Sequence, residues 1–369
     1  GIKENYPTIM QPLTNPGKEG SPAREAVLAG AVDDYGMSYY FRGNVTNNYV
    51  QFANKCWRIV RVTGDGSIKL VLHNDNVNNV TSPCASSNNS DDAAYARYDG
   101  TTYETKFNEN DDDNAYVGFM YGAAGASTYL GAHANTNKST ILQNLETWYN
   151  NNLASYESKL ADTIWCNDKS TKTNQTIINT RLNTTTNKLN KGNSTYPGLG
   201  YGTNLTLYSG RQRVRTNYFY TDTSNKEYGT AGTGPTLICP LDNDGGKLSK
   251  LTVSDTINGN GALDYKIGLL TVDEVLYAGS IDEYGYRVLN YNYSSIKSYL
   301  RENASYWYWS FSPDGFDGVA RVLGVADNGY VLGNNMVTNS SGLRPAVSLT
   351  SATTISGGNG TSSNPFIVN

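Results

Sequence analysis

Histidine is the side chain best suited to proton transfer near neutral pH, and this chain has only two, His73 and His133. Either imidazole could act as the base of a Ser-His-Asp site, which needs a serine nucleophile and an orienting carboxylate. No Gly-x-Ser-x-Gly turn accompanies either histidine. A hydrolase therefore stays a third functional alternative, and the sequence predicts no catalytic residue.

Carboxylates are the second group that could do chemistry, either in glycoside hydrolysis or as calcium ligands. Four of them cluster in the sequence: Asp273, Glu274, Asp282 and Glu283. Glu274 lies three residues after Thr271, which is the spacing of a capping box, so a role at a helix start is simpler. Acidic loops at 111–113 and 242–245 lack EF-hand spacing, and solvated loops are the simpler interpretation. The sequence predicts no metal site and no cofactor.

The four cysteines, Cys56, Cys84, Cys166 and Cys239, are widely spaced and include no Cys-x-x-Cys pair. Neither histidine lies beside a cysteine, so zinc is not expected. Three pairings are possible for two disulfides. We predict Cys56–Cys84 and Cys166–Cys239, because each joins segments with the pattern of neighbouring strands. Four buried free thiols are the alternative.

The composition limits the class of partner. Charged residues make up 17% of the 369 residues and the formal net charge is -4, which argues against nucleic acid and anionic membranes. The 29 tyrosines and many Asn, Thr and Ser residues are typical of secreted β proteins, although base-composition bias explains them equally well. Sequons such as Asn79 and Asn303 would accept glycans in a glycosylating host, and many arise by chance. No apolar stretch approaches the roughly 18 residues of a membrane span. No signal peptide is evident, so Gly1 is expected to be a processed or engineered start.

The N-terminal residues 1–35 are interrupted by prolines and predict an extended arm. Tyr6, Ile9 and Met10 are its candidate contacts with another subunit. Residues 36–369 are predicted to form a single domain with a polar insertion at 168–234. Within that insertion three arginines alternate, Arg211, Arg213 and Arg215. They could form an anion-binding row, but a charge-guarded edge strand is the simpler interpretation.

The elements that must position these residues are mostly strands. Two β runs, Cys56–Val62 and Ser67–Leu72, flank a Gly-Asp-Gly turn and predict a hairpin. Trp57, Ile59 and Arg61 alternate with Arg58, Val60 and Val62; since both faces carry apolar residues, this strand should lie centrally in its sheet. Residues 74–115 are predicted to be long surface loops.

Helices are few. An apolar stripe at helical spacing predicts one long helix over 140–161, with Thr140 and Gln143 as its capping box. Short helices are expected after Thr271 and over 293–301.

The closing segment 306–349 has the pattern of an antiparallel meander. An aromatic strand at 306–311 precedes a Pro-Asp-Gly turn at 313–315, and a second turn is expected at Asn328-Gly329. The last strand is predicted at 344–349. We expect this meander to lie in one sheet with the Trp57 hairpin.

Three landmarks in this order carry a resemblance: Trp57 to Val60, Trp309 to Pro313 and Gly342 to Leu349. They resemble the WRVL-like, W-x-x-SP and GVRPAL-like strands of an uncharacterised family of secreted proteins from Gram-positive and gut bacteria. That family is distantly similar to the C-type-lectin-like fold of the formylglycine-generating enzymes. The resemblance implies an α+β fold with a twisted antiparallel sheet, one long helix, one or two short helices and long ordered loops.

The same resemblance implies little about activity. The reactive cysteine pair of the formylglycine-generating enzymes has no counterpart after Cys239, and the calcium-lectin motifs do not occur. The sequence favours a non-enzymatic extracellular surface or appendage subunit that self-associates into a filament through its arm. The alternative is a monomeric adhesin that binds a host or cell-surface glycan or protein.

Overall fold

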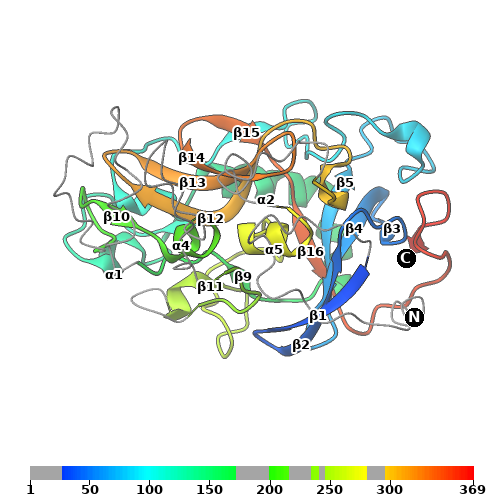
Figure 1. Ribbon diagram of the computed structural model, residues 1–369, viewed down its shortest axis with the longest axis horizontal. Coiled ribbons are helices and arrows are strands. Elements are labelled where there is room, and N and C mark those ends of the chain that lie inside the picture. The colour runs from blue at the N-terminus through cyan, green and yellow to red at the C-terminus, as the bar shows by residue number, and fades with distance from the viewer. Residues whose placement is uncertain (1–26, 172–198, 216–233, 241–245, 281–295) are drawn as a thin grey trace, which may run out of the picture.

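The computed structural model describes residues 27–171, 199–215, 234–240, 246–280 and 296–369, and shows a mixed α+β fold built on two main sheets (Figure 1). The first sheet has the strand order β1-β2-β4-β3-β17, with β5 on the other side of β4 and β16 beyond β5. Its strands are β1 (Val27–Asp33), β2 (Gly36–Arg42), β3 (Tyr49–Phe52), β4 (Lys55–Val62), β5 (Ile68–Asn74), β16 (Ala346–Leu349) and β17 (Phe366–Ile367).

Strand β4 is the centre of the first sheet, as the apolar residues on both of its faces predicted. It pairs with β5 on one side and with β2 and β3 on the other. The β4–β5 hairpin is also confirmed, and it turns at Gly66, whose φ of 87° favours glycine. A bulge between Ile59 and Arg61 breaks the strict alternation that the sequence predicted, and both Arg58 and Arg61 are buried.

The second sheet has the order β14-β13-β12-β15-β6, with β10 paired to the end of β12. Its strands are β6 (Glu104–Lys106), β10 (Thr206–Leu207), β12 (Tyr308–Phe316), β13 (Ala320–Val325), β14 (Val331–Met336) and β15 (Ser340–Gly342). Two small strand pairs lie outside both sheets: β7 (Met120–Tyr121) with β8 (Asn137–Lys138), and β9 (Trp165–Cys166) with β11 (Lys250–Leu251).

The expectation that the closing segment shares one sheet with the Trp57 hairpin is wrong. Strands β12, β13 and β14 build the second sheet, and only β16 joins the first, beside β5. The predicted turn at Pro313 is also wrong, because β12 continues through it to Phe316 and the chain turns before Ala320. Proline lacks an N–H group, and Pro313 is tolerated here because it lies at a bulge in the β12–β13 ladder. The turn at Asn328-Gly329 is confirmed.

Both sheets bury side chains in one hydrophobic core, which includes Trp57 of β4 and Trp309 of β12. Helix α2 (Thr140–Asn152) contributes Trp148, whose ring lies 6.2 Å from that of Trp57. This helix is shorter than predicted, because a 3₁₀ turn replaces it over Ala154–Lys159. Its cap is Ser139, whose hydroxyl accepts a hydrogen bond from the Leu142 N–H group, so the predicted Thr140 capping box is wrong.

The other α-helices are short: α1 (Tyr129–Ala132), α4 (Ser209–Arg215) and α5 (Val272–Tyr277). Helix α5 lies between the two sheets in Figure 1 and contacts strands of both. Thr271 and Glu274 form its capping box, as predicted. Of the helix expected over 293–301, a 3₁₀ turn at Tyr299–Arg301 is described, and residues 293–295 lie outside the described part.

The structure locates parts of the predicted arm and of the predicted polar insertion. Residues 27–33 pair with β2 as a strand, so they belong to the sheet and not to the extended arm; Tyr6, Ile9 and Met10 lie outside the described residues. The start of the predicted polar insertion is buried at Asp168 and Lys169. Arg211, Arg213 and Arg215 lie on α4 and not on an edge strand. Arg213 is not on an exposed strand because its guanidinium forms ion pairs with two buried carboxylates, Asp168 and Asp273.

Candidate binding site

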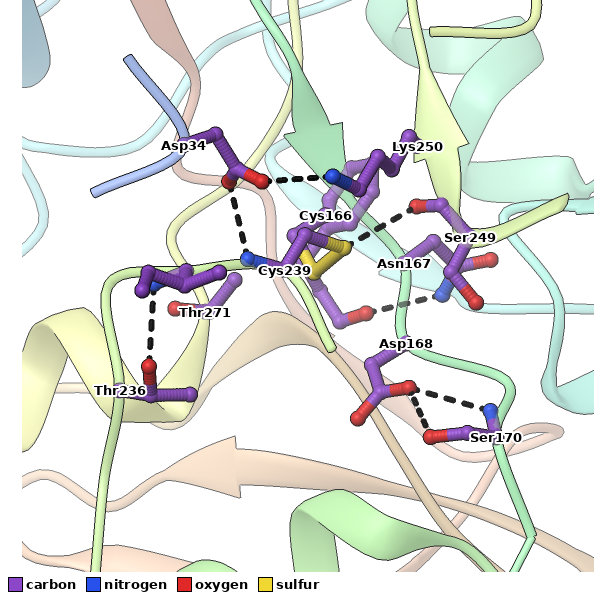
Figure 2. Close-up of a disulfide and its surroundings, with 12 residues drawn as sticks. Asp34, Cys166, Asn167, Asp168, Ser170, Thr236, Cys239, Ser249, Lys250 and Thr271 are labelled. Atoms are coloured by element: carbon purple, nitrogen blue, oxygen red, sulfur yellow. Dashed lines mark hydrogen bonds and ion pairs between the residues drawn. A yellow bond between two sulfur atoms is a disulfide. The ribbon is translucent and has the colours of Figure 1, made fainter. Parts of the chain in front are cut away.

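Both predicted disulfides, Cys56–Cys84 and Cys166–Cys239, are present, and no cysteine is free. Cys56 and Cys166 lie in β4 and β9, whereas Cys84 and Cys239 lie in loops, so the strand-to-strand reasoning was only half right. Figure 2 shows that Asp34 anchors the second bridge: its Oδ2 accepts from the Cys239 N–H group at 2.9 Å, and its Oδ1 pairs with Lys250 Nζ at 2.7 Å.

A buried charge cluster lies beside this bridge. Glu274 Oε1 is 2.5 Å from Lys69 Nζ and 3.2 Å from Arg61 Nε, and Arg61 also pairs with Asp33. Burial raises the pKa of Glu274, but Lys69 and Arg61 outweigh it and the pKa lies below its ordinary value. Glu274 therefore stays charged and binds cations of the protein itself.

Asp273, the sequence neighbour of Glu274, faces a different cation. Its Oδ1 is 2.8 Å from Arg213 Nε, and Arg213 Nη1 is 2.6 Å from Asp168. Between the two clusters is a cavity of about 20 Å³, enough for roughly one water molecule. Asp273 and Glu274 are thus committed to ion pairs and are not a catalytic carboxylate pair. Asp282, Glu283 and the acidic loop 242–245 lie outside the described residues.

The two histidines are enclosed in the core. Burial and the nearby Arg58 and Arg344 lower the pKa of His73 well below its usual range, and its Nε2 is 3.2 Å from Asn303 Nδ2. Burial, with a smaller effect of Lys169, lowers the pKa of His133 to about 3, and its Nε2 lies 3.2 Å from the Tyr208 hydroxyl. Neither ring hydrogen-bonds to a serine in the described part of the chain.

Lys169 is a buried amine with no carboxylate in ion-pair distance among the described residues. Its Nζ donates to the Met120 carbonyl oxygen at 2.9 Å and to Asn135 Oδ1. Burial lowers the pKa of Lys169 to about 7. At neutral pH this group is therefore only partly protonated.

The lowered pKa of Lys169 predicts a pH dependence of stability. The unfolded lysine keeps its ordinary pKa of roughly 10.4, so above pH 7 the unfolded state binds more protons and stability rises with pH. We expect a contribution of about 1 kcal/mol per pH unit between pH 7 and pH 9, from the standard linkage slope. Urea denaturation of the native protein and of Lys169→Met measures it. The variant should lose this slope, and equal slopes in both proteins would contradict the assignment.

A polar hollow lies at the surface, where β5 ends. A cleft of about 200 Å³ is lined mainly by the segments 74–80 and 87–97. Its amide and acidic lining residues are Asn74, Asp75, Asn76, Asn78, Asn88, Asn89 and Asp92. The wall is rigid because Asn76, at a φ of 56°, donates from Nδ2 to the carbonyl oxygens of Asn54 and Val80. The Cys56–Cys84 disulfide links the chain between these two segments to β4.

A group of aromatic residues adjoins this cleft. Arg97 lines the cleft and also lies over the ring of Tyr103, with its guanidinium carbon 4.5 Å from the ring centroid. Tyr103 stacks on buried Tyr95 at 5.2 Å, and the ring of Tyr306 is 6.0 Å from it. Trp307, the next residue, is 38% exposed. The polar cleft and the neighbouring rings of Tyr103 and Tyr306 together form the candidate binding site.

Sequence reasoning missed this site. Residues 74–115 were predicted to be surface loops, yet Ala94, Tyr95 and Phe107 are fully buried and fix the loop conformation. A usable signal was present in the dense Asn, Ser and Asp residues of 74–92 and in the aromatic run at 306–309. What the sequence could not show is that these two segments meet.

The predicted acidic loop 111–113 is used for local structure. Asp113 Oδ1 accepts from the Ala115 N–H group and its Oδ2 from that of Gly125, and Asp111 accepts from the Thr338 hydroxyl. Within the described ranges, no group of three or more His, Cys, Asp or Glu residues is placed to hold a metal ion.

Among the described helices, none has the length and apolarity needed to cross a bilayer. No protein-family model matches this chain, and neither a curated protein nor a solved structure matches it.

Proposed function

We propose that this chain is a non-enzymatic extracellular protein of a bacterial surface. The observation that carries the proposal is the pair of disulfides, because such bonds persist in oxidising compartments and are rare in the cytosol. The polar cleft and the half-buried rings of Tyr103 and Tyr306 beside it add a surface suited to binding, carried by loops on a rigid sheet.

The contacts of the titratable groups support a non-enzymatic role. His73 and His133 are buried with lowered pKa values, so neither imidazole is placed to exchange protons with a bound substrate. Asp273 and Glu274 are bound to arginine and lysine side chains. A catalytic carboxylate or imidazole would need a free position in a cleft.

The fold assignment behind this proposal is a C-type-lectin-like domain. Two features support it: the C-terminal strands β16 and β17 return to the sheet of the N-terminal strands, and long ordered loops leave that sheet. In such a scaffold the loops can change without altering the core.

Surface exposure on the source cells tests the proposal. Antibodies raised against the purified protein should label intact cells, and material isolated from them should contain no thiol reactive under denaturing conditions. Labelling only after permeabilisation, or four free thiols, would contradict an extracellular location.

A second candidate function, assembly into a filament, is favoured by strand β1. It lies at the edge of the first sheet, and beyond β2 its only described backbone pairing is a bridge from Asp33 to Leu237. Its Val32 faces Met37 across the hairpin, and each is 51% exposed. Such an edge can accept a strand from another chain, and the N-terminal residues 1–26 of a second copy are the proposed donor.

Deletion of residues 1–26 separates this candidate from a monomeric binding protein. The full chain should elute as a polymer, whereas the truncated protein and Val32→Lys, which puts a charge on the edge strand, should elute as monomers. Polymers of unchanged size in both variants would rule out this mode of assembly.

A further inference from the structure

We propose that Lys169 and Asn135 form an intramolecular isopeptide bond, in which the lysine amine replaces the amide nitrogen of the asparagine. The two residues are 34 positions apart in the chain, and Lys169 Nζ donates a hydrogen bond to Asn135 Oδ1. Neither residue lines the polar cleft, so the site is separate from the candidate binding site. A covalent bond here closes a loop inside the domain, as a disulfide does, but a reductant does not break it.

The lysine is held at both ends. Its backbone N–H group donates to Ser249 Oγ at 2.9 Å, and its carbonyl oxygen accepts from the Tyr129 hydroxyl at 2.6 Å. The side chain is fully buried, and Nζ also donates to the Met120 carbonyl oxygen at 2.9 Å. These contacts keep the amine beside the amide of Asn135.

The amide of Asn135 is also fixed. Its Nδ2 donates to the Leu248 carbonyl oxygen at 3.0 Å, while its Oδ1 faces Lys169. The backbone of Asn135 has a φ of 57°, a left-handed conformation in which asparagine is favoured over most residues. The side chain is only half-buried, so ammonia released from it can reach solvent.

The surroundings of Lys169 favour a reactive amine, because only the uncharged amine has a lone pair for attack. The other two buried lysines of the described residues are paired with carboxylates, Lys55 with Asp75 and Lys69 with Glu274. Lys169 has no such counter-ion among those residues, and burial lowers its pKa to about 7. At mildly alkaline pH most of this amine is therefore uncharged.

The reaction needs no oxidant, reductant or further reactant. Nζ attacks Cγ of Asn135 to give a tetrahedral intermediate, and one proton passes from Nζ to Nδ2. The Cγ–Nδ2 bond then breaks, ammonia leaves, and the new Nζ–Cγ amide remains. Amines attack primary amides slowly in solution, but well-oriented groups in one molecule reach effective molarities of roughly 10⁵–10⁸ M. The bond should therefore accumulate with time after folding.

The bond also changes the titration of Lys169. Before it forms, the amine titrates, and the pH dependence of stability predicted above applies to protein of unchanged mass. An amide nitrogen does not titrate near neutral pH, so the cross-linked protein should lose that dependence.

Mass spectrometry of the full chain, incubated at mildly alkaline pH after folding, tests the proposal. The native protein should become lighter by one ammonia molecule, in addition to the hydrogens lost at the two disulfides. After reduction, trypsin should release one branched peptide that joins residues 107–138 to residues 160–172. This peptide identifies the bond in the native protein, whatever the stability of any variant.

Two variants locate the loss of ammonia. Lys169→Met and Asn135→Gly should both keep their full mass, and glycine is chosen because it accepts the positive φ at position 135. The matched control is Lys106→Met, which removes a surface lysine that pairs with Glu109 and should lose ammonia as the native protein does.

Either of two results overturns the proposal. The first is a native protein that is folded by circular dichroism and keeps its full mass after incubation. The second is a loss of ammonia that persists in both variants without a branched peptide, because Asn-Gly sequences such as Asn328-Gly329 also release ammonia when they cyclise. An extracellular location is tested separately and can stand in both cases.

Discussion

Replacement of Glu274 with glutamine is expected to lower the free energy of unfolding by about 3–5 kcal/mol, the usual cost of removing one partner of a buried ion pair. Glutamine keeps the size of the side chain and can still accept from the Thr271 N–H group. The loss is therefore that of the charge, which leaves Lys69 and part of Arg61 buried without their counter-ion. Chemical denaturation monitored by circular dichroism measures the change.

The matched control is Glu109→Gln. Glu109 pairs with Lys106 at 2.8 Å, but both side chains are exposed, by 59% and 41%. Pairs of this kind contribute only about 0–1 kcal/mol, because water screens them. Equal effects of the two substitutions would show that the Glu274 cluster is not buried as described.

The lowered pKa of Glu274 adds a pH test of the same cluster. A carboxylate with a depressed pKa stabilises the folded state above its unfolded pKa of roughly 4.3, and this contribution is lost as the pH falls below that value. The native protein should thus lose more stability than Glu274→Gln on acidification. Parallel curves for the two proteins would contradict the direction of the shift.

Removal of the Cys166–Cys239 bridge is the second large expected effect. The bond closes a loop with a sequence separation of 73, and its replacement by two serines should cost about 4 kcal/mol in the loop-closure model. It also releases the loop that carries Cys239, whose N–H group donates to Asp34. The readout is the free energy of unfolding in urea without reductant.

The control for this experiment is the double serine variant of the other bridge. Cys56–Cys84 has a separation of 28, and the same model gives about 3.5 kcal/mol for it. Addition of a reductant should lower the stability of the native protein and leave a variant without either bridge unchanged. If the Cys166–Cys239 variant is as stable as the native protein, the bridge contributes nothing to the folded state.

Local features of the fold could be predicted from the sequence because they depend on residues close together in the chain. The β4–β5 hairpin follows from two alternating runs around Gly66, and the start of α5 from the Thr271–Glu274 capping box. Two local predictions, the cap of α2 and the turn at Pro313, were wrong. Ser139 takes the cap expected at Thr140, and β12 continues through Pro313 at a bulge.

Non-local features could not be predicted in the same way. The pattern of Arg211, Arg213 and Arg215 suggested a strand, but Arg213 is turned inward by Asp168 and Asp273, which lie 45 and 60 residues away in the chain. The candidate site is a further case, since Tyr103 and Tyr306 are far apart in the chain and meet directly beside the buried Tyr95.

The amino-acid sequence by itself determined the strand-rich α+β class, the central β4–β5 hairpin, the cap of α5 and the two cysteine pairs that the structure contains. The tertiary structure decided that the closing segment divides between two sheets, that the histidines and the Asp273–Glu274 pair are buried, and that an amide-lined cleft adjoins half-buried aromatic rings. The physical reason is the range of the forces involved. Turn and cap preferences act over a few residues, whereas the burial of charges and rings depends on which distant segments exclude water together.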